Sequence, residues 1–286
     1  MTRAIIGFTV LVYALSATIA FGAWVTGNSG LLFAAMFVPA LSAALVGYAT
    51  GERLDIDWSR FPLRYLPLAL FLIPVLMHAA MLPATSLLEG HVPRQPWLTP
   101  DQQGLYHAPA ERGWGTLSRT ALAGRIVLNA FFGVVAMSFL ALFEEIGWRG
   151  WLLPRLIARL GTRRAIVVTS VIWGLWHAPF GLTGLVGSPS MSQTAYAAIG
   201  WPIGVFVFGL VLGWLWVRTE SIWIVAIAHG SLNNWGQYAF KYVNDFATAD
   251  EGQVLLAGIA TVFVTGVALL TLGLGSRNAE SHHPGS

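Results

Sequence analysis

Apolar segments close to membrane-spanning length recur along this sequence and strongly limit its fold. A transmembrane helix needs about 20 predominantly apolar residues. Segments of this kind cover roughly residues 4–24, 31–48, 66–82, 121–143, 165–177, 196–217, 222–235 and 254–274. Hydrophobic residues also make up 56% of the chain, more than a soluble domain of 286 residues can bury. We therefore expect an all-α fold, a polytopic membrane helix bundle with about eight transmembrane helices.

The distribution of basic residues predicts how this bundle lies in the membrane. Eight spans place both termini on one side. With cytoplasmic termini, ten of the 16 basic residues lie inside and five outside, and Arg149 lies in or near the membrane. We expect an integral protein of a bacterial inner (plasma) membrane, with residues 1–275 as a single membrane domain and 276–286 as a polar C-terminal tail.

Composition also limits the chemistry available to the chain. There is no cysteine, which excludes thiol nucleophiles, disulfides and cysteine-ligated metals. The net charge of +3 comes from scattered basic residues rather than a cluster, so no nucleic-acid partner is expected. A metal ion here would need histidine and carboxylate ligands.

Two adjacent carboxylates, Glu144 and Glu145, end the apolar run from Leu128 to Leu142. An acidic residue near the centre of a membrane helix costs about 2.5–3.5 kcal/mol, so the two glutamates are expected to face a polar interior. Glu145 and Arg149 are four residues apart, share a helical face and are predicted to pair. Glu144 then points about 100° away around the helix and is free for another role.

Two later apolar segments carry polar groups that could work with Glu144. His177 ends segment 165–177, which also contains Trp173. His229 and Asn233 lie on one helical face of segment 222–235. The residue after Asn233, Asn234, falls on a different face. Together, these groups predict a polar catalytic cavity at membrane depth, built from three helices.

The cavity residues suggest water attack on an amide without a covalent intermediate. Low-dielectric surroundings disfavour the charged form of a carboxylate, so Glu144 can readily accept a proton from water. His177 can share the attacking water. An imidazole and a carboxamide, His229 and Asn233, can both donate to a developing oxyanion. Glu144, His177 and His229 could instead hold a divalent metal such as zinc, and the sequence does not separate the two mechanisms.

Three motifs give the chain a specific resemblance. Glu144-Glu145-x-x-x-Arg149, an aromatic-x-x-x-His177 segment and His229-x-x-x-Asn233 resemble the motifs of the CAAX-protease and bacteriocin-processing (CPBP, or Abi) intramembrane peptidases, which include the type II CAAX prenyl endopeptidases. The resemblance covers roughly residues 143–235, within a motif-bearing core of about 121–240. Trp173 departs from the pattern, which usually has phenylalanine there.

The resemblance implies roles for these residues. Glu144 would activate water with His177 as its partner, and His229 with Asn233 would stabilise the oxyanion. Glu145 and Arg149 would have a structural role.

The implied function is that of an intramembrane endopeptidase cleaving a membrane-associated or prenylated, CAAX-type protein or peptide, with membrane lipid as its surroundings. The alternatives are an idle immunity or scaffold protein of the same family and a proton-coupled transporter using the acidic residues as a relay.

Two further segments have predicted structures. Trp151 to Leu160 alternates apolar and basic faces, which predicts an amphipathic helix at the membrane interface. The proline-containing stretch from about Pro83 to Leu117 predicts an ordered loop. Four ionisable residues of that loop are interpreted as solvated rather than functional: His91, Asp101, His107 and Glu111.

Overall fold

The computed structural model describes residues 3–72, 99–107, 115–183 and 191–243. Most of these residues are helical. In the N-terminal part the elements are α1 (Arg3–Thr26), the 3-10 helix η1 (Ser29–Phe37), α2 (Val38–Thr50), the 3-10 turn η2 (Leu63–Tyr65) and the π-helical η3 (Leu68–Leu72).

The remaining helices carry the three motifs. One continuous helical stretch consists of α4 (Arg119–Leu128), the π-helix η5 (Asn129–Gly133), α5 (Val134–Glu145), the π-helix η6 (Ile146–Leu152) and α6 (Leu153–Leu160). After it come α7 (Thr162–Trp176), α8 (Ala178–Thr183), α9 (Met191–Ala195), the π-helix η7 (Tyr196–Gly200), α10 (Trp201–Thr219) and α11 (Ile222–Val243).

Five helical stretches in the described part of the chain are long and apolar enough to cross a membrane: 3–26, 30–50, 119–160, 162–183 and 197–219. The protein is therefore an integral membrane protein, but the predicted eight spans are not all found. Segment 222–235 forms a helix, α11, whose polar residues lower its mean hydropathy, so it is not among the five. Most of segment 66–82, all of 254–274 and the tail 276–286 lie outside the described residues.

The described part of the predicted loop contains a small sheet, a detail that the all-α expectation did not include. Three two-residue strands, β1 (Thr99–Pro100), β2 (Tyr106–His107) and β3 (Thr116–Leu117), form a small antiparallel sheet in the order β1-β2-β3. Gly104, at φ 77°, allows the tight turn between β1 and β2. The Asp101 carboxylate stabilises that turn by accepting backbone N–H groups of Gln103 and Leu105, each at 2.9 Å.

Two of the four predicted loop residues contact each other at this sheet. His107 Nε2 lies 2.7 Å from Asp101 Oδ2, and both side chains are partly exposed. The hydrogen bond from His107 is the main reason why the pKa of Asp101 lies below its usual value. These contacts explain the local turn without a functional role. His91 and Glu111 lie outside the described residues.

A tryptophan-rich core joins α1 to the motif-bearing helices. Trp148 and Trp151 are fully buried, and Phe8 of α1 stacks on Trp151 with ring centroids 4.7 Å apart. Leu152, Leu153 and Leu156 continue this buried face, while Arg159 on the opposite face is exposed. The segment 151–160 is amphipathic as predicted, but Trp151 lies within η6 rather than in a separate helix.

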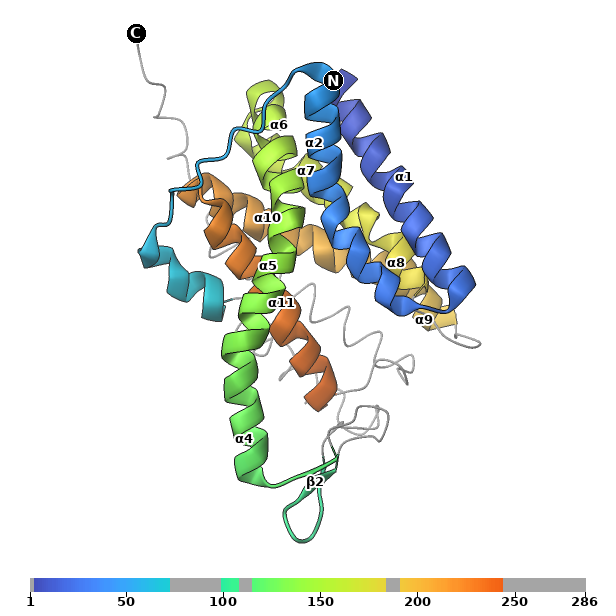
Figure 1. The fold of residues 1–286 in the computed structure, drawn as a ribbon, viewed down its shortest axis with the longest axis vertical. Coiled ribbons are helices and arrows are strands. Elements are labelled where there is room, and N and C mark those ends of the chain that lie inside the picture. The colour runs from blue at the N-terminus through green and yellow to red at the C-terminus, as the bar shows by residue number, and fades with distance from the viewer. Residues whose placement is uncertain (1–2, 73–98, 108–114, 184–190, 244–286) are drawn as a thin grey trace.

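Glycines let the motif-bearing helices approach closely. A Cβ added at Gly230 of α11 would lie 2.3 Å from the backbone of Ser138 in α5, and one at Gly209 of α10 would lie 2.7 Å from the Ser170 side chain in α7. Small residues at such crossings are typical of packed membrane helices. Figure 1 shows α11 crossing beside α5 and the long α4–α6 stretch running along the molecule. This packing brings the motif residues of α5, α7 and α11 close to one another.

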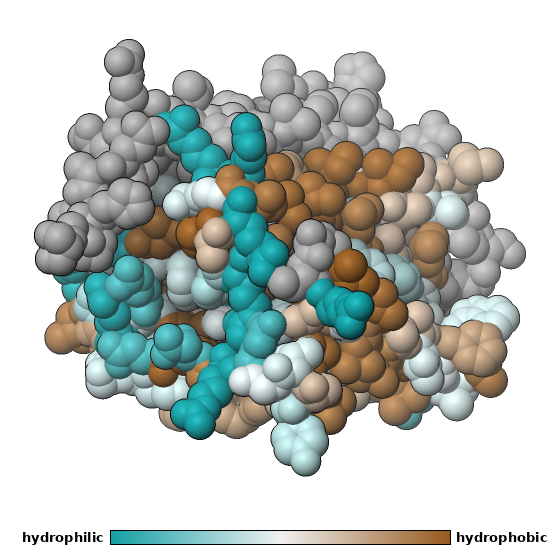
Figure 2. All heavy atoms as spheres, turned by 90° about the horizontal axis from the view of Figure 1, so that it is seen from above, coloured by the Kyte–Doolittle hydropathy of each residue, from teal (hydrophilic) through white to brown (hydrophobic). Residues whose placement is uncertain are grey.

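The surface matches a protein surrounded by lipid. Large apolar side chains on the long helical stretch point outward, with Phe131, Phe132 and Val135 about 70% exposed (70%, 71% and 69%). Polar pairs connect segments elsewhere: Arg155 Nε lies 2.6 Å from Glu52 Oε2, and Arg60 Nη1 lies 2.7 Å from Glu220 Oε2. Figure 2 shows a hydrophilic band crossing one end of the molecule between hydrophobic surfaces.

Candidate active site

The six residues singled out from the sequence lie on three packed helical stretches. Glu144 and Glu145 end α5, and Arg149 lies in η6 directly after them. His177 caps the C-terminus of α7, where the helix ends before Pro179, and α11 carries His229 and Asn233. Glu144 is 3% exposed and His229 2%, while His177 and Asn233 are only partly buried.

Glu145 forms the predicted ion pair and a second contact that the sequence did not indicate. Arg149 Nη1 donates to Glu145 Oε1 at 2.8 Å, and both side chains are fully buried. The same oxygen lies 2.7 Å from Nδ1 of His229. Glu145 therefore orients a residue of α11 as well as Arg149.

The contact with Glu145 decides which nitrogen of His229 is available for chemistry. A carboxylate accepts hydrogen bonds, so Nδ1 of His229 carries the hydrogen. Nε2 is then the free nitrogen. It can donate to an oxyanion only when the ring is protonated on both nitrogens.

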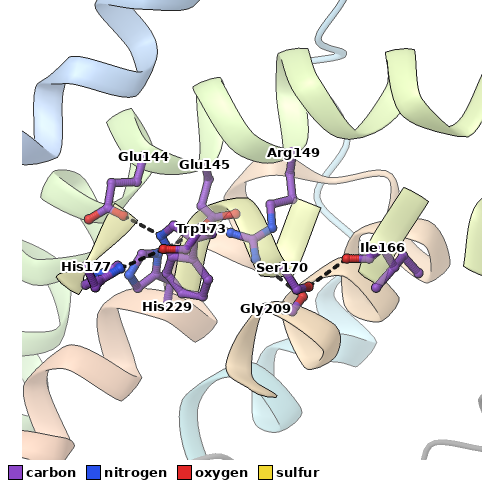
Figure 3. A network of polar contacts seen from close by, with 9 residues as sticks. All are labelled: Glu144, Glu145, Arg149, Ile166, Ser170, Trp173, His177, Gly209 and His229. Atoms are coloured by element: carbon purple, nitrogen blue, oxygen red, sulfur yellow. Dashed lines mark hydrogen bonds and ion pairs between the residues drawn. The ribbon is translucent and has the colours of Figure 1, made fainter. Parts of the chain in front are cut away.

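Trp173 contacts both Glu144, the predicted general base, and His177, its predicted partner. Its indole Nε1 donates to Glu144 Oε2 at 2.9 Å, and its backbone carbonyl accepts from His177 Nδ1 at 3.0 Å (Figure 3). Because a carbonyl can only accept, His177 donates through Nδ1, and Nε2 keeps its lone pair in the neutral ring. No direct hydrogen bond joins Glu144 to His177 among the described residues.

Aromatic and cationic contacts hold this group in place. The Arg149 guanidinium carbon lies 4.6 Å from the centroid of the Trp173 ring, within the range of a cation–π contact. The Trp173 ring also meets the rings of His177 and His229 edge to face, with centroids 5.4 and 5.1 Å apart. Arg149 further donates to the Gly209 carbonyl of α10 at 3.4 Å. The site is therefore tied to four helices.

The two asparagines of α11 differ in their contacts. Asn234 is 5% exposed, and its Oδ1 accepts from Asn129 Nδ2 at 3.0 Å. This pair links α11 to η5, which belongs to the same continuous helical stretch as Glu145, the contact of His229. For the Asn233 carboxamide, the described residues provide no hydrogen bond. Sequence reasoning missed Asn129, which only the register between η5 and α11 reveals.

The possible metal-ligating side chains are the last feature of the site. Within the described residues, no three His, Asp or Glu side chains are grouped to hold a metal ion. Glu144, His177 and His229, the ligand set considered from the sequence, therefore do not fit a three-ligand site in this arrangement. Glu145 and Trp173 occupy one nitrogen of His229 and one oxygen of Glu144.

Comparison with known proteins supports the resemblance noted from the motifs. Residues 125–235 match the family described as type II CAAX prenyl endopeptidase Rce1-like. The matched segment contains all six predicted site residues as well as Trp173 and Asn129. This region is therefore similar to that family.

A curated protein is also similar to part of this chain. The chain is 23% identical over 151 residues to a protein named CAAX prenyl protease 2 from Methanococcus maripaludis. The alignment covers 52% of this chain and 56% of that protein, so the chain matches little more than half the length of its relative.

Proposed function

We propose that this protein is an intramembrane endopeptidase that cleaves a membrane-associated or prenylated, CAAX-type protein or peptide. The observation that carries the proposal is a buried carboxylate, Glu144, which accepts a hydrogen bond from Trp173, the residue that also holds His177, next to the buried Glu145–His229 pair. Burying these groups in an apolar bundle is costly, and the match to a CAAX-type family supports a catalytic reason for it. Membrane lipid and a peptide or lipidated protein are its proposed partners.

In the proposed reaction, water attacks the peptide carbonyl directly. Glu144 takes a proton from the water while the water oxygen bonds to the carbonyl carbon. Nε2 of His177 accepts a hydrogen bond from the other hydrogen of that water. The carbonyl π electrons move to the oxygen and form an oxyanion. When the intermediate collapses, the C–N bond breaks and Glu144 returns its proton to the leaving amine.

The oxyanion needs donors from α11 in this mechanism. His229 would donate through Nε2 as an imidazolium, with the negative Glu145 holding its Nδ1. Asn233 lies one turn further along the same helix and would donate through its carboxamide. Arg149 would keep Glu145 correctly placed.

Proteolysis by the purified protein tests this function. Wild type and Glu144→Ala would be incubated, in detergent or liposomes, with a peptide library containing prenylated and unprenylated C-terminal sequences. Mass spectrometry of the products should show cleavage by the wild type alone. If both proteins leave every peptide intact while remaining folded, the chain is better explained as an idle scaffold or a transporter.

Loss of the Asn233 carboxamide should weaken catalysis without abolishing it. Removing one oxyanion donor typically lowers kcat by about 10²–10³-fold, so Asn233→Ala should retain slow but measurable cleavage. Asn234→Ala is the matched comparison, because it removes the neighbouring carboxamide that bonds to Asn129 instead. Equal turnover by Asn233→Ala and wild type would remove Asn233 from the oxyanion site.

The proposed orientation in a bacterial inner membrane has its own test. Reporters inserted after Gly51 and Gly161 should read cytoplasmic, and a reporter after Gly104 should read external, if both termini are cytoplasmic. The prediction rests on the excess of arginine in the segments assigned to the inside. An external signal at Gly51 or Gly161 would contradict the orientation.

A further inference from the structure

Trp173 is the one described residue that hydrogen-bonds to both Glu144 and His177. Its side chain donates to the carboxylate at 2.9 Å, and its backbone carbonyl accepts from the imidazole at 3.0 Å. Figure 3 shows both side chains converging on it. Because one rigid residue makes both bonds, it determines which oxygen of Glu144 and which nitrogen of His177 remain free to contact water. Those atoms are Oε1 of Glu144 and Nε2 of His177.

We propose that Trp173 is a positioning residue that holds the Glu144 carboxylate in its reactive orientation through the indole N–H. This inference rests on the proposed function for its kinetic consequence. A phenylalanine, the residue expected here from the motif, would fill much of the same space but has no donor. The tryptophan therefore adds a contact to the base that the phenylalanine pattern lacks.

The surroundings of Trp173 show why its indole can act as a fixed donor. The residue is 2% exposed, so water does not compete for the N–H. Arg149 lies over the ring at 4.6 Å, and the two histidine rings meet it edge to face. These contacts restrict rotation of the ring. Rotation of the Glu144 carboxylate away from His177 would break a buried, charge-assisted bond.

Trp176 provides a matched control on the same helix. It is 3% exposed, and its indole Nε1 donates to Ser16 Oγ at 2.7 Å rather than to a glutamate. Trp173→Phe and Trp176→Phe each keep an aromatic ring and each remove one buried indole donor. Both rings lie edge to face with His177, with centroids 5.4 Å away for Trp173 and 4.8 Å for Trp176, so the two variants differ in whether the lost hydrogen bond reached Glu144.

The kinetic test compares these two variants. Trp173→Phe should lower kcat about 10- to 100-fold, as expected for losing a hydrogen bond to a charged group, with KM changed less than about twofold. Trp176→Phe should keep kcat within about threefold of wild type. Wild-type kcat in Trp173→Phe, or an equal loss in both variants, would overturn the proposal.

A spectroscopic test is independent of peptidase activity. In protein labelled with ¹⁵N-tryptophan, the indole resonance missing from Trp173→Phe identifies Trp173. That resonance should shift when Glu144 is replaced by glutamine, and in wild type it should shift with pH as Glu144 takes up a proton. A resonance unaffected by both changes would overturn the bond itself. If the bond is found and wild type cleaves no peptide, the proposed function fails while the contact stands.

Discussion

Glu144→Gln should abolish most peptide cleavage while leaving the protein folded. Glutamine has nearly the shape of glutamate, and its carbonyl oxygen can still accept the Trp173 N–H. It cannot take a proton from water, and general-base catalysis typically contributes about 10²–10⁴-fold to the rate. Steady-state kinetics on a cleaved peptide should therefore show kcat falling by that factor, with little change in KM.

Glu220→Gln is the control for this substitution. Glu220 is exposed at the end of α10, where it pairs with Arg60 and has no contact with the site. Its replacement should leave both kcat and KM unchanged. If Glu144→Gln cleaves at the wild-type rate, Glu144 is not the base and the mechanism is wrong.

Arg149→Ala should destabilise the protein more than any surface substitution. It leaves the Glu145 carboxylate buried next to His229 without its cationic partner. Breaking a buried ion pair in this way costs about 3–5 kcal/mol. Contacts with the Trp173 ring and the Gly209 carbonyl are lost as well. Equilibrium unfolding in detergent should show the loss directly.

Two further variants separate charge from geometry at this position. Arg149→Lys keeps a positive charge near Glu145 but not the planar group on Trp173, so we expect an intermediate loss of stability. Arg159→Ala removes an exposed arginine of α6 and should change the free energy of unfolding by less than about 0.5 kcal/mol. An Arg149→Ala protein as stable as wild type would disprove the structural role of the ion pair.

Local spacing predicted those features of the site that lie within one helix. The i, i+4 separation of Glu145 and Arg149 gave their pairing, which persists at 2.8 Å although Arg149 lies in a π-helical segment. The same rule predicts that Asn234, five residues after His229, lies off the face that His229 shares with Asn233. Helical geometry alone determines such relations.

Contacts between helices could not be predicted in the same way. Glu145 reaches His229 because Gly230 lets α11 approach the backbone of Ser138, a register that no local pattern encodes. The bond from Trp173 to Glu144 depends on the rotation of α7 against α5. A tryptophan in an apolar segment is usually a packing residue, so its donor role had no sequence signal.

In the proposed mechanism, water held by Glu144 attacks the peptide carbonyl directly. A single turnover in H₂¹⁸O, with enzyme in excess over peptide, tests it most directly. We expect the new carboxylate of the product to carry one ¹⁸O atom and the intact mass of the enzyme to stay unchanged during turnover. An unlabelled product, or an enzyme mass increased by the acyl fragment of the peptide, would contradict it.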